Sequence, residues 1–315
     1  MDSVCPVLLH AHTVYIATHV SPDGDAIGSS LGLALALGAL GKRCTVACAD
    51  PAPPPVSGLP GAKMIVAHPP SNQDVIVVLD TGDVSRLGSL YTPESFSGRP
   101  VINIDHHLSN TRFGTINIID AQAAAVGEMV HTLVVAMGVP LNSMIATCLL
   151  TAIVTDTIGF RTSSTTPNVL RTAAALMEAG ASLTDIVQQS FESRPLPVLR
   201  VWGDVLSNFH ARNGVAWATI SRQLLELHGV KDDEIKGLVN ILRGTQGIVV
   251  SALIMESTDG TVKVEFRSNG QVNVAAIAIA LGGGGHRAAS GCTMKAPLAE
   301  VEQRVLDEIN KQLRP

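Results

Sequence analysis

The chain has 315 residues, of which 46% are hydrophobic and 3% aromatic, and its formal net charge at pH 7 is −5. This composition excludes a disordered chain and allows a sizeable core, in one large domain or two medium ones. The negative charge argues against a protein that binds long duplex nucleic acid, although a few placed groups could still hold a small nucleotide.

Short strand-like segments alternate with longer helical segments through the first half of the chain. Runs of apolar and β-branched residues predict strands over 14–19, 44–49, 74–80 and 100–107. Longer apolar runs predict helices over 26–41, 124–138, 142–157 and 166–180. Prolines and glycines mark 51–61 as a loop. Because the strands are continuously apolar, we predict an α/β domain over 1–190, with a mostly parallel sheet and helices on both of its faces.

The sequence changes in character around residues 191–211, where two prolines precede a helical stretch. We interpret this segment as a linker with a connecting helix. Beyond it, strands are predicted over 214–221, 247–257 and 262–268, with helices near 222–243 and over 298–313. The sequence therefore predicts a second, smaller α+β domain over 212–315.

The five cysteines are scattered and form no CxxC pair, so we interpret them as ordinary thiols of a reducing compartment. The N-terminus has no basic segment before an apolar run, which argues against a signal peptide. The most apolar stretches are shorter than the roughly 20 residues that a membrane span requires. We expect a cytoplasmic protein with no membrane partner.

Acidic and imidazole residues cluster where the predicted strands end. The candidates at strand ends are His19, Asp80, Asp105, His106 and His107, and those at helix ends are Asp23, Asp25 and Asp156. One aspartate at a strand end is most often a turn cap, but ligands of open α/β sheets bind at the carboxyl ends of the strands. Several strands that deliver ligand-type residues to one edge therefore predict a metal site.

Carboxylates and imidazoles without a thiolate favour Mn²⁺, Mg²⁺, Co²⁺ or Fe²⁺ over a structural zinc ion. The candidate ligands outnumber what one ion needs if positions stay open for water and substrate. A pair of ions about 3.5–4 Å apart, with a bridging carboxylate, would use them all.

Four motifs carry a resemblance to a known family. HVSPDGDAIGSS, LDTGD, IDHH and TDT, in this order, resemble the motifs of the DHH phosphoesterase superfamily, which is RecJ-like. The downstream FRS and GGGGHRAASGC resemble its DHH-associated C-terminal domain, so the match spans nearly the whole chain. The compact length resembles the branch of bifunctional oligoribonucleases and pAp phosphatases, the nanoRNases.

The resemblance implies a role for each residue of the site. One metal would be held by His19, Asp23 and Asp80, and the other by Asp25, Asp80, His106 and Asp156. Asp80 would bridge two Mn²⁺ ions per chain, with Mg²⁺ or Co²⁺ as alternatives. His107 would contact the scissile phosphate or protonate the leaving oxygen, with a purely orienting hydrogen bond as its alternative role. Asp105 would orient a histidine.

The second domain is expected to bind the substrate. Glycine-rich loops let backbone N–H groups approach an anion closely, and Arg267 and Ser268 could meet the same phosphate. The expected substrate-binding residues are Gly283, Gly284, Gly285, His286, Arg267, Ser268 and Arg161. A flexible turn beside a solvated arginine is the alternative for the glycine run, and a surface salt bridge is the alternative for Arg161.

The resemblance implies a Mn²⁺-dependent phosphoesterase. It would hydrolyse short oligonucleotides to mononucleotides and pAp to AMP, with a hydroxide activated by two metals. One alternative is a phosphodiesterase that acts on cyclic di-AMP or on a linear dinucleotide. An alternative of another class is a non-catalytic regulator that binds nucleotides. The resemblance also allows a homodimer.

Overall fold

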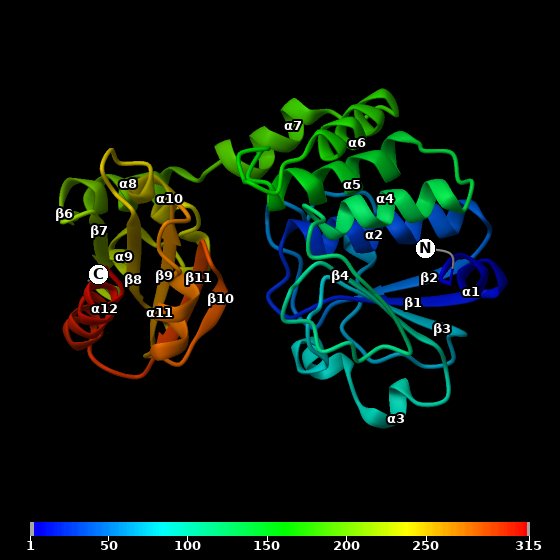
Figure 1. Cartoon of the computed structure of the whole chain (residues 1–315), viewed down its shortest axis with the longest axis horizontal. Helices are drawn as coiled ribbons and strands as arrows, with labels where there is room; N and C mark the ends of the chain where they lie inside the picture. The colour runs from blue at the N-terminus through cyan, green and yellow to red at the C-terminus, as the bar shows by residue number, and fades with distance from the viewer. Residues whose placement is uncertain (1–2, 314–315) are drawn as a thin grey trace. The chain divides into compact units, whose positions relative to one another are not determined.

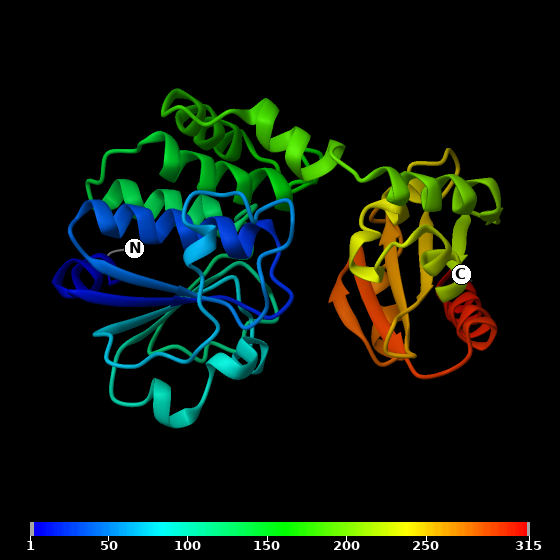
Figure 2. The same cartoon turned by 180° about the vertical axis from the view of Figure 1, so that it is seen from behind.

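The computed structural model describes residues 3–313 and separates into two compact units, which divide between Ser193 and Arg194. Figures 1 and 2 show the units from opposite sides. Each unit contains one sheet and a hydrophobic core of its own. The division falls inside the segment 191–211, in which the sequence indicates a linker.

A five-stranded parallel sheet organises the first unit, in the order β2-β1-β3-β4-β5. Its strands are β1 (Thr13–Ala17), β2 (Arg43–Ala47), β3 (Val75–Leu79), β4 (Val101–Asp105) and β5 (Ile116–Ile119). Every residue of β3 and β4 is buried, which explains their continuous apolar sequence. The predicted parallel sheet is confirmed, whereas the half-buried β5 has no counterpart in the sequence prediction.

Helices cover both faces of this sheet, as predicted. They are α1 (Cys5–His10), α2 (Gly24–Ala39), η1 (Ala62–Met64), η2 (Val84–Leu90), α3 (Pro93–Phe96), α4 (Val126–Ala136), α5 (Ser143–Asp156), α6 (Pro167–Glu178), α7 (Leu183–Val187) and η3 (Gln188–Glu192). On one face Val14 and Ile16 join a core with α2, α4 and α5 (Figure 1). On the other face Tyr15 and Ala17 pack with residues of η2 and α3.

The helices α2 and α5 approach each other unusually closely, because glycines of α2 face α5. A Cβ atom on Gly28 would lie 2.5 Å from the carbonyl oxygen of Cys148, and one on Gly24 would lie 2.3 Å from the side chain of Thr155. A side chain at either position would push the helices apart. This contact places the start of α2 beside the C-terminal end of α5, where Asp156 lies.

The second unit contains a six-stranded mixed sheet, in the order β10-β11-β9-β8-β7-β6, in which β7 and β8 are parallel. Its strands are β6 (His210–Arg212), β7 (Val215–Ile220), β8 (Val250–Glu256), β9 (Val262–Ser268), β10 (Gly284–His286) and β11 (Ala289–Met294). Its helices are α8 (Leu196–Ser207), α9 (Arg222–His228), η4 (Asp232–Glu234), α10 (Leu238–Arg243), α11 (Val274–Ala280) and α12 (Leu298–Leu313).

Two separate cores cover the faces of this second sheet. α11 and α12 pack on one face, where Val301, Val305 and Ile309 of α12 are fully buried at a helical spacing. α8, α9 and α10 pack on the other. The helix expected within the linker is therefore α8, and it belongs to the core of the second unit.

Two segments of the second unit differ from their predicted form. The single helix expected near 222–243 is interrupted, because Gly229 ends α9 and Gly237 precedes α10, both with left-handed backbones (φ 65° and 91°). The glycine-rich segment 282–291 contains the β10–β11 hairpin. A Cβ atom on Gly283 would lie 2.1 Å from the carbonyl oxygen of Gly291, so the close strand pairing itself requires glycine there.

Candidate metal centre

The loop after β1 carries the first two candidate ligands. His19 is buried, and its Nδ1 lies 2.8 Å from both the carbonyl oxygen of Val20 and Nη2 of Arg86, so Nδ1 is occupied and Nε2 is left to face a cation. Asp23 caps α2, since its Oδ1 accepts the backbone N–H groups of Asp25 and Ala26, both at 3.0 Å. The cap uses one oxygen of Asp23 and leaves the other for a ligand.

Asp25 lies in the first turn of α2 and performs a different task. Its buried carboxylate accepts the backbone N–H of Val126 at 2.6 Å and that of Gly127 at 2.9 Å. These groups begin α4, so the two aspartates of the DGD motif stabilise the N-termini of two different helices. Asp25 is thereby fixed in place at the carboxyl edge of the sheet.

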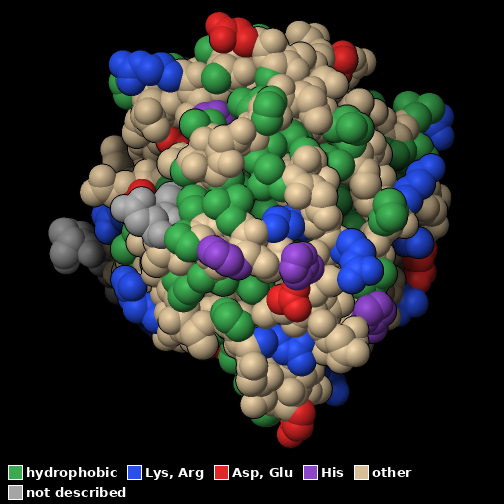
Figure 3. Space-filling model, turned by 90° about the vertical axis from the view of Figure 1, so that its right-hand side faces the viewer, with side chains coloured by type: hydrophobic (Ala, Val, Ile, Leu, Met, Phe, Trp, Pro, Cys, Tyr) green, Lys and Arg blue, Asp and Glu red, His purple; other side chains and the backbone are tan. Residues whose placement is uncertain are grey.

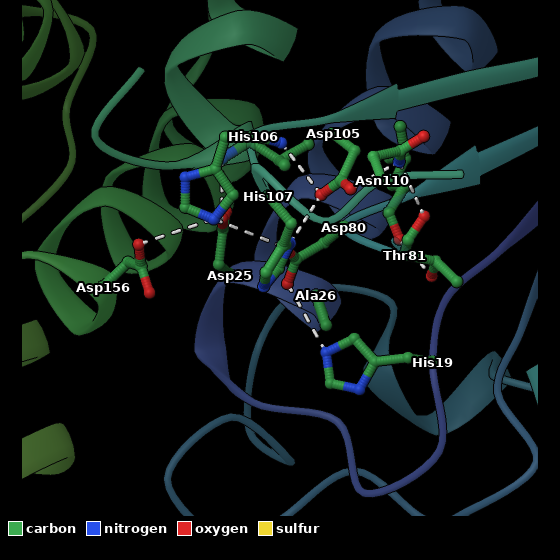
Figure 4. A network of polar contacts seen from close by, with 12 residues as sticks. His19, Asp25, Ala26, Asp80, Thr81, Asp105, His106, His107, Asn110 and Asp156 are labelled. Atoms are coloured by element: carbon green, nitrogen blue, oxygen red, sulfur yellow. Dashed lines mark hydrogen bonds and ion pairs between the residues drawn. The ribbon is translucent and has the colours of Figure 1, made fainter. Parts of the chain in front are cut away.

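Asp80 lies at the centre of the cluster (Figure 4). It directly follows β3, is buried, and has a left-handed backbone with φ 54°. Its Oδ2 lies 3.5 Å from Nε2 of His19, and its Oδ1 lies 3.6 Å from Nε2 of His106. This Oδ1 is buried and accepts no hydrogen bond from the described residues. Because an unsatisfied buried carboxylate oxygen is costly, the position suits a bound cation.

His106 and Asp156 complete the second set of ligands. Nδ1 of His106 lies 3.1 Å from the carbonyl oxygen of Ala123, which orients Nε2 toward the carboxylates. This Nε2 lies 3.7 Å from Oδ2 of Asp156 and 4.0 Å from Oδ2 of Asp25. Asp156 is the last residue of α5, so helices and the loops that follow strands all contribute to the cluster.

His107 is held by a chain of hydrogen bonds at the end of β4. Its Nδ1 donates to Oδ1 of the fully buried Asp105 at 2.7 Å. Asn110 donates to the other oxygen of Asp105 at 2.6 Å and to Oδ1 of Asn103 at 2.8 Å. This arrangement fixes both the ring orientation and the tautomer of His107.

The structure brings all of the proposed ligand side chains together. Three groups have ligand atoms within 4.8 Å of one another, namely His19 with Asp23 and Asp80, Asp25 with His106 and Asp156, and Asp80 with His106 and His107. The first two groups divide the residues as the family resemblance implies, and Asp80 lies beside both. Oxygen and imidazole ligands of this kind suit divalent cations.

The electrostatics of the cluster also call for positive charge. Burial raises the pKa values of Asp25 and Asp80 well above the ordinary range, and neighbouring carboxylates raise both further. Burial likewise raises the pKa of Asp156 to about 6. Burial lowers the pKa of His19, and the Arg86 guanidinium lowers it further. A divalent cation would favour the ionised carboxylates and the neutral histidines together.

Three polar residues beside the cluster have no counterpart in the sequence prediction. Nη2 of Arg86 lies 2.8 Å from Nδ1 of His19, Asn110 supports Asp105, and Glu128 contacts the segment before α4. Tertiary packing brings them to the site from η2, from the loop after β4 and from α4. Only Asn110 and Arg86 carry a sequence signal for a place at the site, because they lie close to the IDHH and LDTGD motifs in the chain.

Three of the residues expected to bind substrate lie outside the glycine-rich hairpin. Arg267 is partly buried on β9, where burial lowers the pKa of its guanidinium. The hydroxyl of Ser268 donates to the carbonyl oxygen of Val272 at 2.8 Å and accepts the N–H of Gly270 at 3.2 Å, so it stabilises its own turn. Arg161 is exposed in the turn after α5 and donates from Nε to the carbonyl oxygen of Ile158 at 2.7 Å.

The β10–β11 hairpin exposes the remaining expected substrate residues. His286 and the preceding glycines are exposed. Gly283 lines an open hollow of about 450 Å³ together with Lys263 and Glu265 of β9. A Cβ atom on Gly284 would meet no other atom within 4 Å, so the space beside this glycine is open. The roles of these residues stay predictions.

Comparison with known proteins identifies the family. Residues 13–153 match the DHH family N-terminal domain, and residues 219–314 match the DHHA1 domain. The bifunctional oligoribonuclease and PAP phosphatase NrnA of Thermus thermophilus is 40% identical over 95% of this chain and 90% of its own length. The chain belongs to the DHH family. The expected family, fold class and enzyme class, a hydrolase of phosphoester bonds, are confirmed.

Two further relatives cover nearly the whole chain. The NrnA protein of Bacillus subtilis is 29% identical over 90% of this chain and 89% of its own length. The crystal structure of an exopolyphosphatase-related protein from Bacteroides fragilis superposes with a TM-score of 0.92 at 27% identity, covering 98% of this chain and 95% of that one. Among residues 3–313, no helix combines the length and apolar character needed to cross a membrane.

Proposed function

We propose that this DHH protein is a Mn²⁺-dependent phosphoesterase that hydrolyses short oligonucleotides to mononucleotides and pAp to AMP. The observation that carries the proposal is the pair of ligand groups that meet at Asp80, whose buried Oδ1 has no donor among the described residues. The NrnA relatives, named as oligoribonucleases and PAP phosphatases, support the choice of substrates.

The proposed ligand sets follow the geometry of the cluster. One ion would be held by His19, Asp23 and Asp80, and the other by Asp25, Asp80, His106 and Asp156. When bound, such a pair of ions lowers the pKa of water and neutralises charge on a phosphoryl group. Manganese suits this mixture of carboxylate and imidazole ligands, and Mg²⁺ or Co²⁺ could replace it.

We assign the proton-handling role to His107. Its Nδ1–H is committed to Asp105, so Nε2 is the atom that would hydrogen-bond the scissile phosphate or give a proton to the leaving oxygen. Hydrogen bonds from His107 and Asn110 outweigh the effect of burial and hold the pKa of Asp105 below its ordinary value. Asp105 therefore stays ionised and holds the imidazole of His107 through its Nδ1–H.

The second unit would supply the groups that hold the substrate. Arg267 offers a guanidinium, and the exposed hairpin offers the backbone of Gly284 and the ring of His286. The net charge of −5 and the scattered basic side chains on the end of the first unit that carries α1 (Figure 3) favour small substrates over long duplexes.

The test is hydrolysis of pAp, the dinucleotide pApA and cyclic di-AMP, side by side in Mn²⁺ and in chelator. We expect AMP from pAp and pApA, no opening of cyclic di-AMP, and no turnover in chelator. Fast opening of cyclic di-AMP would make this a cyclic dinucleotide phosphodiesterase instead. Bound metal without turnover of any of the three would contradict the proposed substrates and favour a nucleotide-binding regulator.

A further inference from the structure

One short segment of the first unit contacts two proposed ligands of the same metal. The carbonyl oxygen of Ala123 lies 3.1 Å from Nδ1 of His106. Three and four residues later, the N–H groups of Val126 and Gly127 donate to the carboxylate of Asp25. The segment 123–127 therefore orients one histidine from the loop after β4 and one aspartate from α2 at the same time.

The segment does not hold its own shape through an ordinary helix cap. Ala125 is the N-cap of α4 and has no side chain that could accept a hydrogen bond. Asp25 satisfies the first two N–H groups of the helix, so it serves as the missing cap. If the segment moved, Asp25 would lose its partners, and the imidazole of His106 would lose the acceptor that orients it.

Glu128 is the side chain that fixes this segment. It lies in the first turn of α4 and is buried, with 8% of its surface exposed. Its Oε2 accepts the N–H of Ala124 at 3.0 Å, which ties the chain back against the helix. Its Oε1 accepts the side-chain amide of Asn168 on α6 at 3.0 Å. Both carboxylate oxygens are thus used by the fold.

We propose that Glu128 is a positioning residue for one of the two metals, the one held by Asp25, His106 and Asp156. The inference rests on the proposed two-metal function. Glu128 acts through the segment 123–127 and belongs to none of the groups of ligand atoms found among the described residues. The other metal, at His19 and Asp23, depends on a different loop and does not depend on Glu128.

The experiment is a Mn²⁺ titration of the full chain by calorimetry and by electron paramagnetic resonance. The Glu128→Ala variant should bind one Mn²⁺ with the affinity of the parent chain and the second about 10- to 100-fold more weakly. At two equivalents of Mn²⁺, its electron paramagnetic resonance spectrum should therefore still show the signal of an isolated ion. Glu128→Gln keeps an acceptor for Ala124 and should restore most of the second affinity. Glu178→Ala, at an exposed glutamate that ends α6, is the matched control and should bind both ions normally.

The outcomes separate the inference from the function on which it rests. If the parent chain binds fewer than two Mn²⁺ ions, the two-metal function and the inference both fail. If the parent binds two and Glu128→Ala binds both with unchanged affinity, or loses both equally, only the inference fails. Should Glu128→Ala not fold, Asn168→Ala removes the outer hydrogen bond alone and must still weaken the same single ion selectively.

Discussion

Asp80 is the central side chain of the proposed metal centre in the first unit. It lies between both ligand sets, is buried, and has a left-handed backbone. Strained backbone at a residue with an unsatisfied polar atom is characteristic of functional sites. The surrounding fold, rather than the stability of the residue itself, keeps Asp80 in this conformation.

Replacing Asp80 by asparagine should abolish most of the activity. Asparagine tolerates the left-handed backbone, so Asp80→Asn removes the charge and keeps the fold. We expect kcat/KM in Mn²⁺ to fall about 10³-fold, with no loss of thermal stability in chelator, since the lost charge is buried among like charges. Asp83→Asn is the matched control, because asparagine can also cap Ser85, and it should be near normal. Substantial turnover in Asp80→Asn would contradict the proposed mechanism.

Asn110 tests whether the orientation of His107 matters for the reaction. Asn110→Ala removes the donors to Asp105 and Asn103, so the carboxylate and the imidazole can turn. We expect kcat to fall about 10- to 100-fold, with KM and Mn²⁺ affinity nearly unchanged. The same substitution should have no further effect in a His107→Ala background, because the two residues act as one unit. Additive losses in this double-mutant cycle would show that Asn110 acts elsewhere.

At the level of the elements, the ends of β1, β3 and β4 could be predicted because buried parallel strands are continuously apolar and polar residues mark their termini. The role of Glu128 could not be predicted, because its contacts with the site depend on tertiary packing. The β10–β11 hairpin could not be predicted either, since a run of glycines usually indicates a loop.

Substitutions of two neighbouring glycines can distinguish the role of the hairpin in packing from its proposed role in substrate binding. Gly283→Ala would clash with β11 and should destabilise the second unit by about 1–3 kcal/mol. Gly284→Ala faces open space and should leave the melting temperature unchanged. If the backbone of Gly284 contacts the substrate, this variant should raise KM about tenfold, or about 1.4 kcal/mol in binding. An unchanged KM would remove Gly284 from the proposed substrate site.

On the scale of the whole molecule, the two units have separate sheets and separate cores. We propose that one unit binds the metals and the other binds the substrate. All of the proposed metal ligands belong to the first unit, whereas the glycine-rich hairpin belongs to the second. Metal binding should therefore act on the stability of one unit. This separation makes the location of the metals testable without any substrate.

Chelation should lower the unfolding temperature of the first unit alone. An ion present at 100 times its dissociation constant stabilises the folded state by about 2.7 kcal/mol. For a unit of this size that corresponds to a shift of about 5–10 °C. Calorimetry of the full chain with Mn²⁺ and with chelator would resolve the shift, and hydrogen exchange would assign it to β1, β3 and β4. Asp80→Asn should lose the shift, because its ligand set is incomplete. An equal loss of hydrogen-exchange protection in β7, β8 and β9 on chelation would show that metal binding stabilises the second unit as well, and it would contradict the proposed site.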